Sequence, residues 1–119
     1  MTLAGCGGGI VISLGDYGDL PPDVSLVANV SQAFAGDVVT LSAAASDDYG
    51  VDTVEFYRVE PGGSRTLLGT DGRAPWTLDT LMPDVIGSSG STIVRYLARA
   101  TDGAGQRSES ATITVQQLR

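Results

Sequence analysis

The chain has 119 residues, with 14 acidic and 7 basic side chains and no histidine, so its net charge is −7. At this length one domain with one core is expected, and the negative charge repels nucleic acid and anionic membrane surfaces. Without histidine the chain lacks the commonest general base and the usual nitrogen ligand of zinc. The composition favours cations as small partners, and its many strand- and turn-forming residues predict an all-β fold.

The N-terminus begins with Leu3-Ala4-Gly5-Cys6, which three glycines follow. This pattern resembles a bacterial lipobox, in which the chain is cut before the cysteine and the thiol carries a lipid. The residues before Cys6 are too few for a signal peptide, whose apolar region alone takes about 7 to 15 residues. Cys6 therefore has three interpretations: a lipid anchor, an intermolecular disulfide, or a thiol without a role. The lipid anchor is the single contact with a membrane that we expect.

A short apolar strand is predicted next, outside the main domain. It consists of Ile10, Val11, Ile12, Ser13 and Leu14. Turn-forming residues follow it, and Pro21 and Pro22 stiffen the connection to the domain. The strand is a remnant of an apolar signal region, an extra edge strand of its own sheet, or a strand donated to a neighbouring copy. We divide the chain into an N-terminal arm, residues 1–20, and a domain, residues 21–119.

Alternating apolar residues predict the strands of the domain. The expected strands are residues 24–28, 38–46, 53–59, 65–69, 76–79, 92–101 and 111–116. Their inward positions are Val39, Leu41, Ala43, Ala45, Val54, Phe56, Val94, Tyr96, Ala98, Ala100, Ala111, Ile113 and Val115. Trp76 is expected in the same core because of its large apolar surface. Residues 82–91 are the least patterned part of the domain.

Four stretches carry a more specific resemblance: VSLVA, GDVVTLSAAASDDYGVDTVEFYR, LLGTDGRAPWTLD and RYLARATDGAGQRSESATITV. They are similar to the bacterial Ig-like domains that occur as repeated modules of secreted and surface proteins, and the similarity covers Pro22 to Gln116. The resemblance implies an immunoglobulin-like Greek-key β-sandwich of about seven strands, here with an extra N-terminal strand. It also implies a non-catalytic spacer, adhesive or carbohydrate-associated module, secreted or at the bacterial cell surface, and names no ligand.

Acidic residues are expected to meet at one end of such a sandwich, where the first strand begins and two loops lie. The candidate metal ligands are Asp19, Asp23, Asp47, Asp48 and Asp102, with Asp16 on the same N-terminal segment. Carboxylates and carbonyls are the ligands of Ca²⁺, and extracellular sites bind it at about 10⁻⁴ to 10⁻³ M. The alternative is that these aspartates accept hydrogen bonds from the backbone of their own turns.

No catalytic group is predicted. Paired carboxylates hydrolyse glycosides across a cleft, whereas we expect Asp47 and Asp48 on a loop and Glu55 on an outward strand face. For a glycan, the candidates for a stacking platform are Tyr17, Tyr49, Tyr57 and Trp76.

Two functions fit these expectations. The first is an extracellular structural protein that donates Ile10–Leu14 to the next copy and so forms a filament, with Ca²⁺ stiffening the junction. The second is a monomeric surface lipoprotein or spacer module that binds a glycan or a partner protein.

Overall fold

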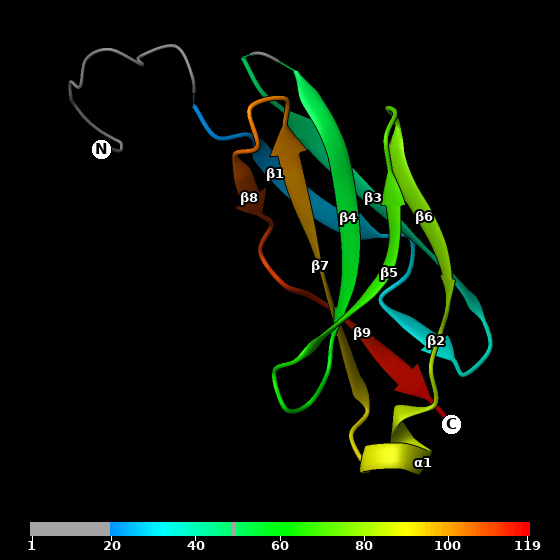
Figure 1. Cartoon of the computed structure of the whole chain (residues 1–119). Coiled ribbons are helices and arrows are strands. Elements are labelled where there is room, and N and C mark those ends of the chain that lie inside the picture. Colours follow the sequence, from blue (N-terminus) through cyan, green and yellow to red (C-terminus); the bar gives the residue numbers. More distant parts are fainter. Residues whose placement is uncertain (1–19, 49) are drawn as a thin grey trace.

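The described part of the chain, residues 20–48 and 50–119 of a computed structural model, forms two sheets that face each other (Figure 1). The small sheet contains β1 (Asp23–Ala28), β3 (Val38–Ser46) and β6 (Trp76–Leu81), in that order. The large sheet contains, in order, β2 (Gln32–Phe34), β9 (Ile113–Leu118), β7 (Ile93–Asp102), β4 (Val51–Val59) and β5 (Arg65–Asp71). A further strand, β8 (Arg107–Glu109), pairs with β7 beside β9.

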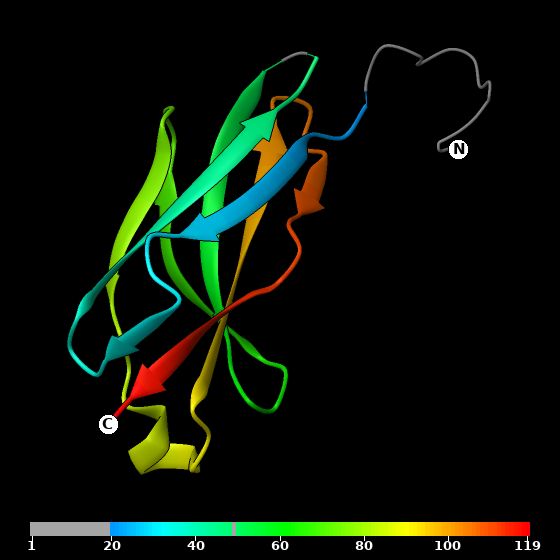
Figure 2. The ribbon, with the colours of Figure 1, turned by 180° about the vertical axis from the view of Figure 1, so that it is seen from behind.

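The chain passes back and forth between the sheets, from β3 to β4, from β5 to β6 and from β6 to β7 (Figure 2). All pairs are antiparallel except β2 with β9, which are parallel. This is the connectivity of an Ig-like sandwich, so the predicted fold class is confirmed.

The core lies between the sheets and follows the predicted alternation. Val39 and Leu41 of β3 and Val54 and Phe56 of β4 are fully buried. In β7 every second residue from Val94 to Asp102 is buried as well. Ala43, Ala45 and Ile113 pack against this core from partly buried positions, and Trp76 is 8% exposed.

The last strand begins later than predicted, and Ala111 is exposed instead of inward. The reason is a break in pairing between β8 and β9. The Ser110 hydroxyl accepts a hydrogen bond from Ala98 N at 2.9 Å and donates to Ala111 O at 2.9 Å. Ser110 N also donates to Ala98 O at 2.8 Å. Ser110 thus provides hydrogen-bond partners for both backbone groups of Ala98 in β7, and the next residue, Ala111, faces solvent.

Residues 82–91, which lacked a pattern, contain the short helix α1 (Val85–Ser89). The Asp84 side chain accepts from Gly87 N at its start, and Gly90 ends it with a positive φ of 74°. Its remaining partner comes from β9: Gln117 Oε1 accepts from Val85 N and Ile86 N at 2.8 and 2.9 Å. A distant strand therefore fixes the helix, which local sequence could not predict.

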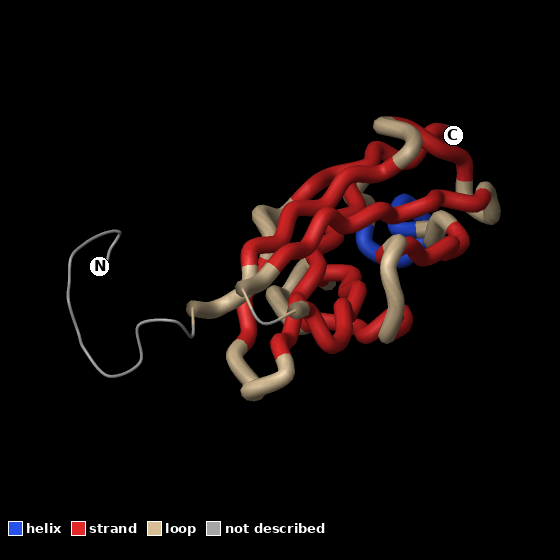
Figure 3. The backbone as a smooth tube through the Cα atoms, turned by 90° about the horizontal axis from the view of Figure 1, so that it is seen from above, coloured by secondary structure: helices blue, strands red, loops and turns tan. Residues whose placement is uncertain are grey.

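The described residues extend 54 × 26 × 20 Å, so the sandwich has two distinct ends. We call the end where β1 begins and β3 finishes the acidic pole, because Asp23, Asp47 and Asp48 lie there. The other end, where β9 finishes beside α1, is the distal pole (Figure 1). Residues 20–22 lead away from the sandwich at the acidic pole, as Figures 1–3 show.

Candidate functional site

Three of the predicted metal ligands lie at the acidic pole. Asp23 opens β1 and pairs in register with Ser46, the last residue of β3. Asp47 and Asp48 follow directly, so the three carboxylates belong to adjoining chain segments. A surface hollow of about 270 Å³ is lined by Leu20, Pro21, Asp23, Ser46, Asp47 and Asp48. The pairing of β1 with β3 thus places these three residues at the same end of the sandwich.

Asp102 has a different environment, facing inward at the end of β7 with 2% of its surface exposed. Its Oδ1 accepts hydrogen bonds from Ala104 N and Gln106 N at 2.9 and 2.8 Å. Its own N–H donates to Gln106 O at 3.0 Å, which closes the turn before β8. One carboxylate oxygen therefore holds the turn, as in the alternative interpretation. The other, Oδ2, is buried and has no hydrogen-bond partner among the described residues.

The described carboxylates do not form a metal site by themselves. Within residues 20–48 and 50–119, no three His, Cys, Asp or Glu side chains lie close enough to share a metal ion. Asp16 and Asp19 lie outside the described residues. A calcium site at this pole would need ligands beyond the described carboxylates.

The two N-terminal candidates, Cys6 and the strand Ile10–Leu14, also lie outside the described residues. The structure does show where their segment joins the domain. Pro22 is buried beside the start of β1, whereas Leu20 is exposed. The arm is therefore attached at the acidic pole, at the opposite end from the C-terminus (Figure 1).

A network of charges crosses the outer face of the large sheet, and the sequence did not predict it. Arg99 of β7 pairs with Glu55 of β4, with Nη2 and Oε1 2.6 Å apart. Arg99 also donates to the Tyr57 hydroxyl at 2.7 Å and lies over the Tyr57 ring, 5.3 Å from its centroid. The hydrogen bond that Arg99 donates to Glu55 raises the pKa of Arg99, and burial followed by the Glu55 charge raises the pKa of Tyr57. Glu55 is thus the ion-pair partner of Arg99 on this face.

The same face carries a second bridge, in which the Arg65 guanidinium of β5 contacts both carboxylate oxygens of Glu109 of β8. Strands β4 and β7 lie between these two strands in the sheet. The bridge therefore crosses the sheet from one side to the other and lies on the same face as Arg99. The sequence did place Arg95 and Arg99 on the outward face of β7. Their partners could not be predicted from it, because these depend on which strands lie next to β7.

The two described members of the candidate stacking platform do not share a face. Trp76 points into the core from the small sheet, as expected, and Tyr57 lies on the outer face of the large sheet under Arg99. The large sheet lies between them because alternation directs Tyr57 away from the core. Tyr17 and Tyr49 lie outside the described residues.

Comparison with protein families gives one match: the model of the bacterial Ig domain matches residues 22–115. Comparison with curated proteins finds no match. Bacterial Ig domains are structural modules found generally in surface or secreted proteins. Among the described residues no helix is long and apolar enough to cross a membrane. With most of its length matched, and with the two-sheet topology just described, the chain belongs to the bacterial Ig domain family.

Proposed function

We propose that the chain is an extracellular structural module that joins copies of itself end to end, each copy lending its Ile10–Leu14 strand to the next. The observation that carries this proposal is the attachment of the arm. A core drawn from both sheets lies within residues 24–115, and the arm that bears the apolar strand joins that domain at its acidic pole. The C-terminus lies at the distal pole (Figure 1). The arm with the apolar Ile10–Leu14 segment thus joins the module at one end, and the C-terminus lies at the other.

An apolar strand gains most by adding to an unpaired sheet edge, where main-chain hydrogen bonds and side-chain burial combine. In the described residues β1 and β6 are the edges of the small sheet, and β2 and β5 end the large one. Because donor and acceptor are different surfaces of one molecule, the contact is heterologous. Heterologous contacts between identical copies propagate unless the rotation closes a ring. The expected product is a filament.

Electron microscopy of the purified full chain tests this proposal. The comparison variants lack residues 6–20 or carry Ile12→Asp, which places a charge in the middle of the strand. Filaments from the full chain and single particles from both variants are the expected result, because a charge on an edge blocks strand addition. Monodisperse particles from all three samples would rule out the filament.

Calcium at the acidic pole is the second element of the proposal. Its support is the hollow at Asp23, Asp47 and Asp48, the buried Oδ2 of Asp102, and the Asp19 that precedes Leu20 in the sequence. Cation binding there would stiffen the attachment of the arm. Calcium at ten times its Kd stabilises the folded state by about 1.4 kcal/mol, which corresponds to a Tm increase of about 5 to 10 °C for a domain of this size.

The measurement is Tm at increasing CaCl₂, with MgCl₂ as the ionic-strength control. The matched variants are Asp48→Asn at the pole and Asp79→Asn on the outer face of β6. We expect Asp48→Asn to lose the calcium-dependent increase and Asp79→Asn to keep it. An unchanged Tm of the unaltered chain at millimolar calcium would rule out the site.

The lipobox-like segment favours a second candidate, a monomeric surface lipoprotein or spacer module that binds a glycan or a partner protein. A lipid on Cys6 would attach the acidic pole to the membrane and direct the distal pole outward. Mass spectrometry of the chain extracted from bacterial membranes tests this alternative. A diacylglycerol-modified Cys6 at the N-terminus would support it, and an unmodified chain in the culture medium would contradict it.

A further inference from the structure

The two lateral sides of the sandwich are built differently. On the β5–β6 side a Cβ atom added to Gly69 would lie 2.8 Å from Leu78 Cδ1, so the two sheets are in direct contact there. On the other side, among the described residues, β1 pairs with β3 alone and lies beside β8 and β9 of the opposite sheet without pairing with them.

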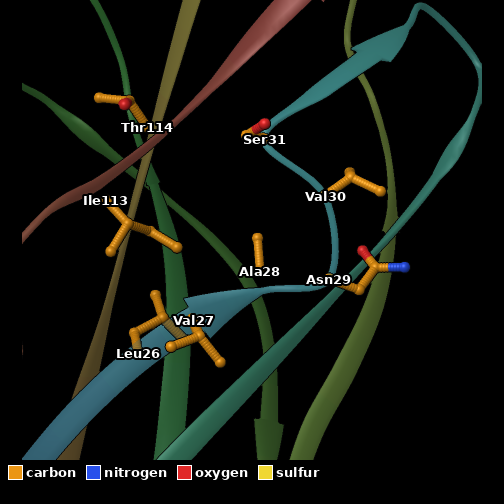
Figure 4. Close-up of a pocket in the computed structure, with 8 residues that line it drawn as sticks. All are labelled: Leu26, Val27, Ala28, Asn29, Val30, Ser31, Ile113 and Thr114. Atoms are coloured by element: carbon orange, nitrogen blue, oxygen red, sulfur yellow. The ribbon is translucent and has the colours of Figure 1, made fainter.

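A groove lies on this second side, where the chain crosses from one sheet to the other (Figure 4). Asn29 ends β1 by pairing with Thr40 of β3: its N–H donates to Thr40 O at 3.0 Å, and its Oδ1 accepts from Thr40 N at 2.9 Å. Two residues later Ser31 O accepts from Gln116 N of β9 at 2.9 Å. This crossover forms one wall of the groove, which has a volume of about 310 Å³.

The groove is uncharged in a protein whose net charge is −7. It is lined by Leu26, Val27, Ala28, Asn29, Val30, Ser31, Ile113 and Thr114. Leu26 and Ile113 belong to the core and its margin, so the groove opens onto apolar surface. Val27 and Val30 beside it are 62% and 37% exposed. An apolar, uncharged occupant would cover both.

The other sheet edges are shorter or charged. The β2 and β8 edges are three residues long each, and β8 includes Arg107 and Glu109, both exposed. The β6 edge presents Asp79, and β5 begins with Arg65, which is already bridged to Glu109. Charged residues on an edge oppose the addition of an apolar strand.

We propose that the groove along the outer edge of β1 receives the Ile10–Leu14 strand of a second copy. This inference rests on the proposed strand donation and assigns its acceptor. Five residues span about 17 Å and the six of β1 about 20 Å, so the donated strand matches the edge in length. Alternation places Ile10, Ile12 and Leu14 on one face, toward the groove, and leaves Val11 and Ser13 beside Val27.

The attachment of the arm favours a second copy over the chain's own strand. Pro22 is buried at the start of β1 and Pro21 precedes it, and both hold the backbone extended. To pair with β1 of its own domain, the strand would therefore have to reverse direction within residues 15–20, whereas a strand that continues outward reaches a neighbouring copy. Residues 20–22 lead away from the sandwich in all three views (Figures 1–3).

Disulfide trapping with single-cysteine chains tests the acceptor. In a Cys6→Ser background, one chain carries Ile12→Cys and a mass-tagged second chain carries Val30→Cys. Each has one thiol, so a disulfide between the two chains forms where their Cα atoms come within about 7 Å. The matched control replaces Val30→Cys with Leu67→Cys, which is 51% exposed on β5. Unchanged Tm values of the reduced chains show that each still folds.

We expect rapid formation of the mixed dimer with Val30→Cys and little with Leu67→Cys. Equal trapping at both positions, or none at Val30→Cys, would overturn the assigned groove. A chain carrying both Ile12→Cys and Val30→Cys should give a ladder of oligomers, and an internally bridged monomer would overturn the second copy as occupant. If the unaltered chain forms filaments but Val30→Cys is not trapped, the groove is not the acceptor, although strand donation still stands. If the unaltered chain forms no filaments, strand donation itself is refuted.

Discussion

At the scale of single residues, many of the acidic side chains stabilise local structure. Several carboxylates accept hydrogen bonds from backbone N–H groups of neighbouring turns, and others pair with arginine or threonine. The first group is Asp37, Asp71, Asp84 and Asp102, and the second is Glu55, Glu60, Asp79 and Glu109. A count of charges predicts a cation-binding surface and does not reveal that these eight carboxylates have partners within the protein.

The first prediction concerns Glu60. The Thr66 hydroxyl donates to Glu60 Oε2 at 2.5 Å, and this bond, with Arg58 Nε at 3.0 Å, lowers the pKa of the Glu60 carboxyl. We expect Thr66→Val to raise that pKa toward its ordinary value and leave it below, because Arg58 remains. An NMR pH titration of Glu60 measures it, with Thr70→Val on the same strand as control.

The pH dependence of the protein's stability should reflect the titration of Glu60. Since the folded-state pKa of Glu60 lies below its unfolded value of 4.5, its contribution is present above that value and is lost as the pH falls through the folded pKa. Thr66→Val should therefore lose less stability than the unaltered chain on acidification from neutral pH. Urea titrations at a series of pH values measure the free energy of unfolding. An equal loss of this free energy in both chains on acidification would contradict the role of Thr66.

At the scale of elements, what the sequence predicts depends on the length of the pattern. β3, β4 and β7 have nine or ten residues with clear alternation, so Val39, Phe56 and Tyr96 could be placed in the core from the sequence. β2 and β8 have three residues each and exist through pairing with distant strands. Long strands follow local preference, and short ones follow tertiary contacts.

The helix α1 gives the second prediction, because Gln117 of β9 holds it. Gln117 is buried, accepts from two helix N–H groups and donates to Asp84 Oδ1 at 3.1 Å. Gln117→Ala should leave Val85 N and Ile86 N without this acceptor and cost about 1 to 3 kcal/mol.

Hydrogen exchange checks this prediction at the resolution of one amide. Exchange at Val85 and Ile86 should accelerate more in Gln117→Ala than exchange at Phe56 in the core of β4. Gln116→Ala is the matched control, since that side chain is exposed and its backbone bond to Ser31 remains. Equal acceleration in both variants would show that Gln117 does not hold the helix.

At the scale of the whole molecule, the sequence predicted the gathering of acidic residues at one end, since that follows from the order of strands in an Ig-like sandwich. It did not predict the open groove at β1. The groove exists because Asn29 ends one strand and Ser31 begins pairing in the other sheet, a crossover that no alternation pattern reveals. The candidate donor strand could be predicted from local sequence. The candidate acceptor could be identified only once the two sheets were assembled.

Head-to-tail joining makes the third prediction, that two variants unable to assemble alone will assemble together. A donor-deficient chain carries Ile10→Asp and Ile12→Asp, and an acceptor-deficient chain carries Val30→Asp and Thr114→Asp, both exposed or half-exposed groove positions. Each alone should sediment as a monomer of about 12.2 kDa. In an equimolar mixture the intact strand of the second chain meets the intact groove of the first, and growth stops there because neither remaining surface is active. Sedimentation velocity should therefore show a dimer in the mixture alone. A mixture that stays monomeric, or a dimer from either variant by itself, would contradict a heterologous contact between this strand and this groove.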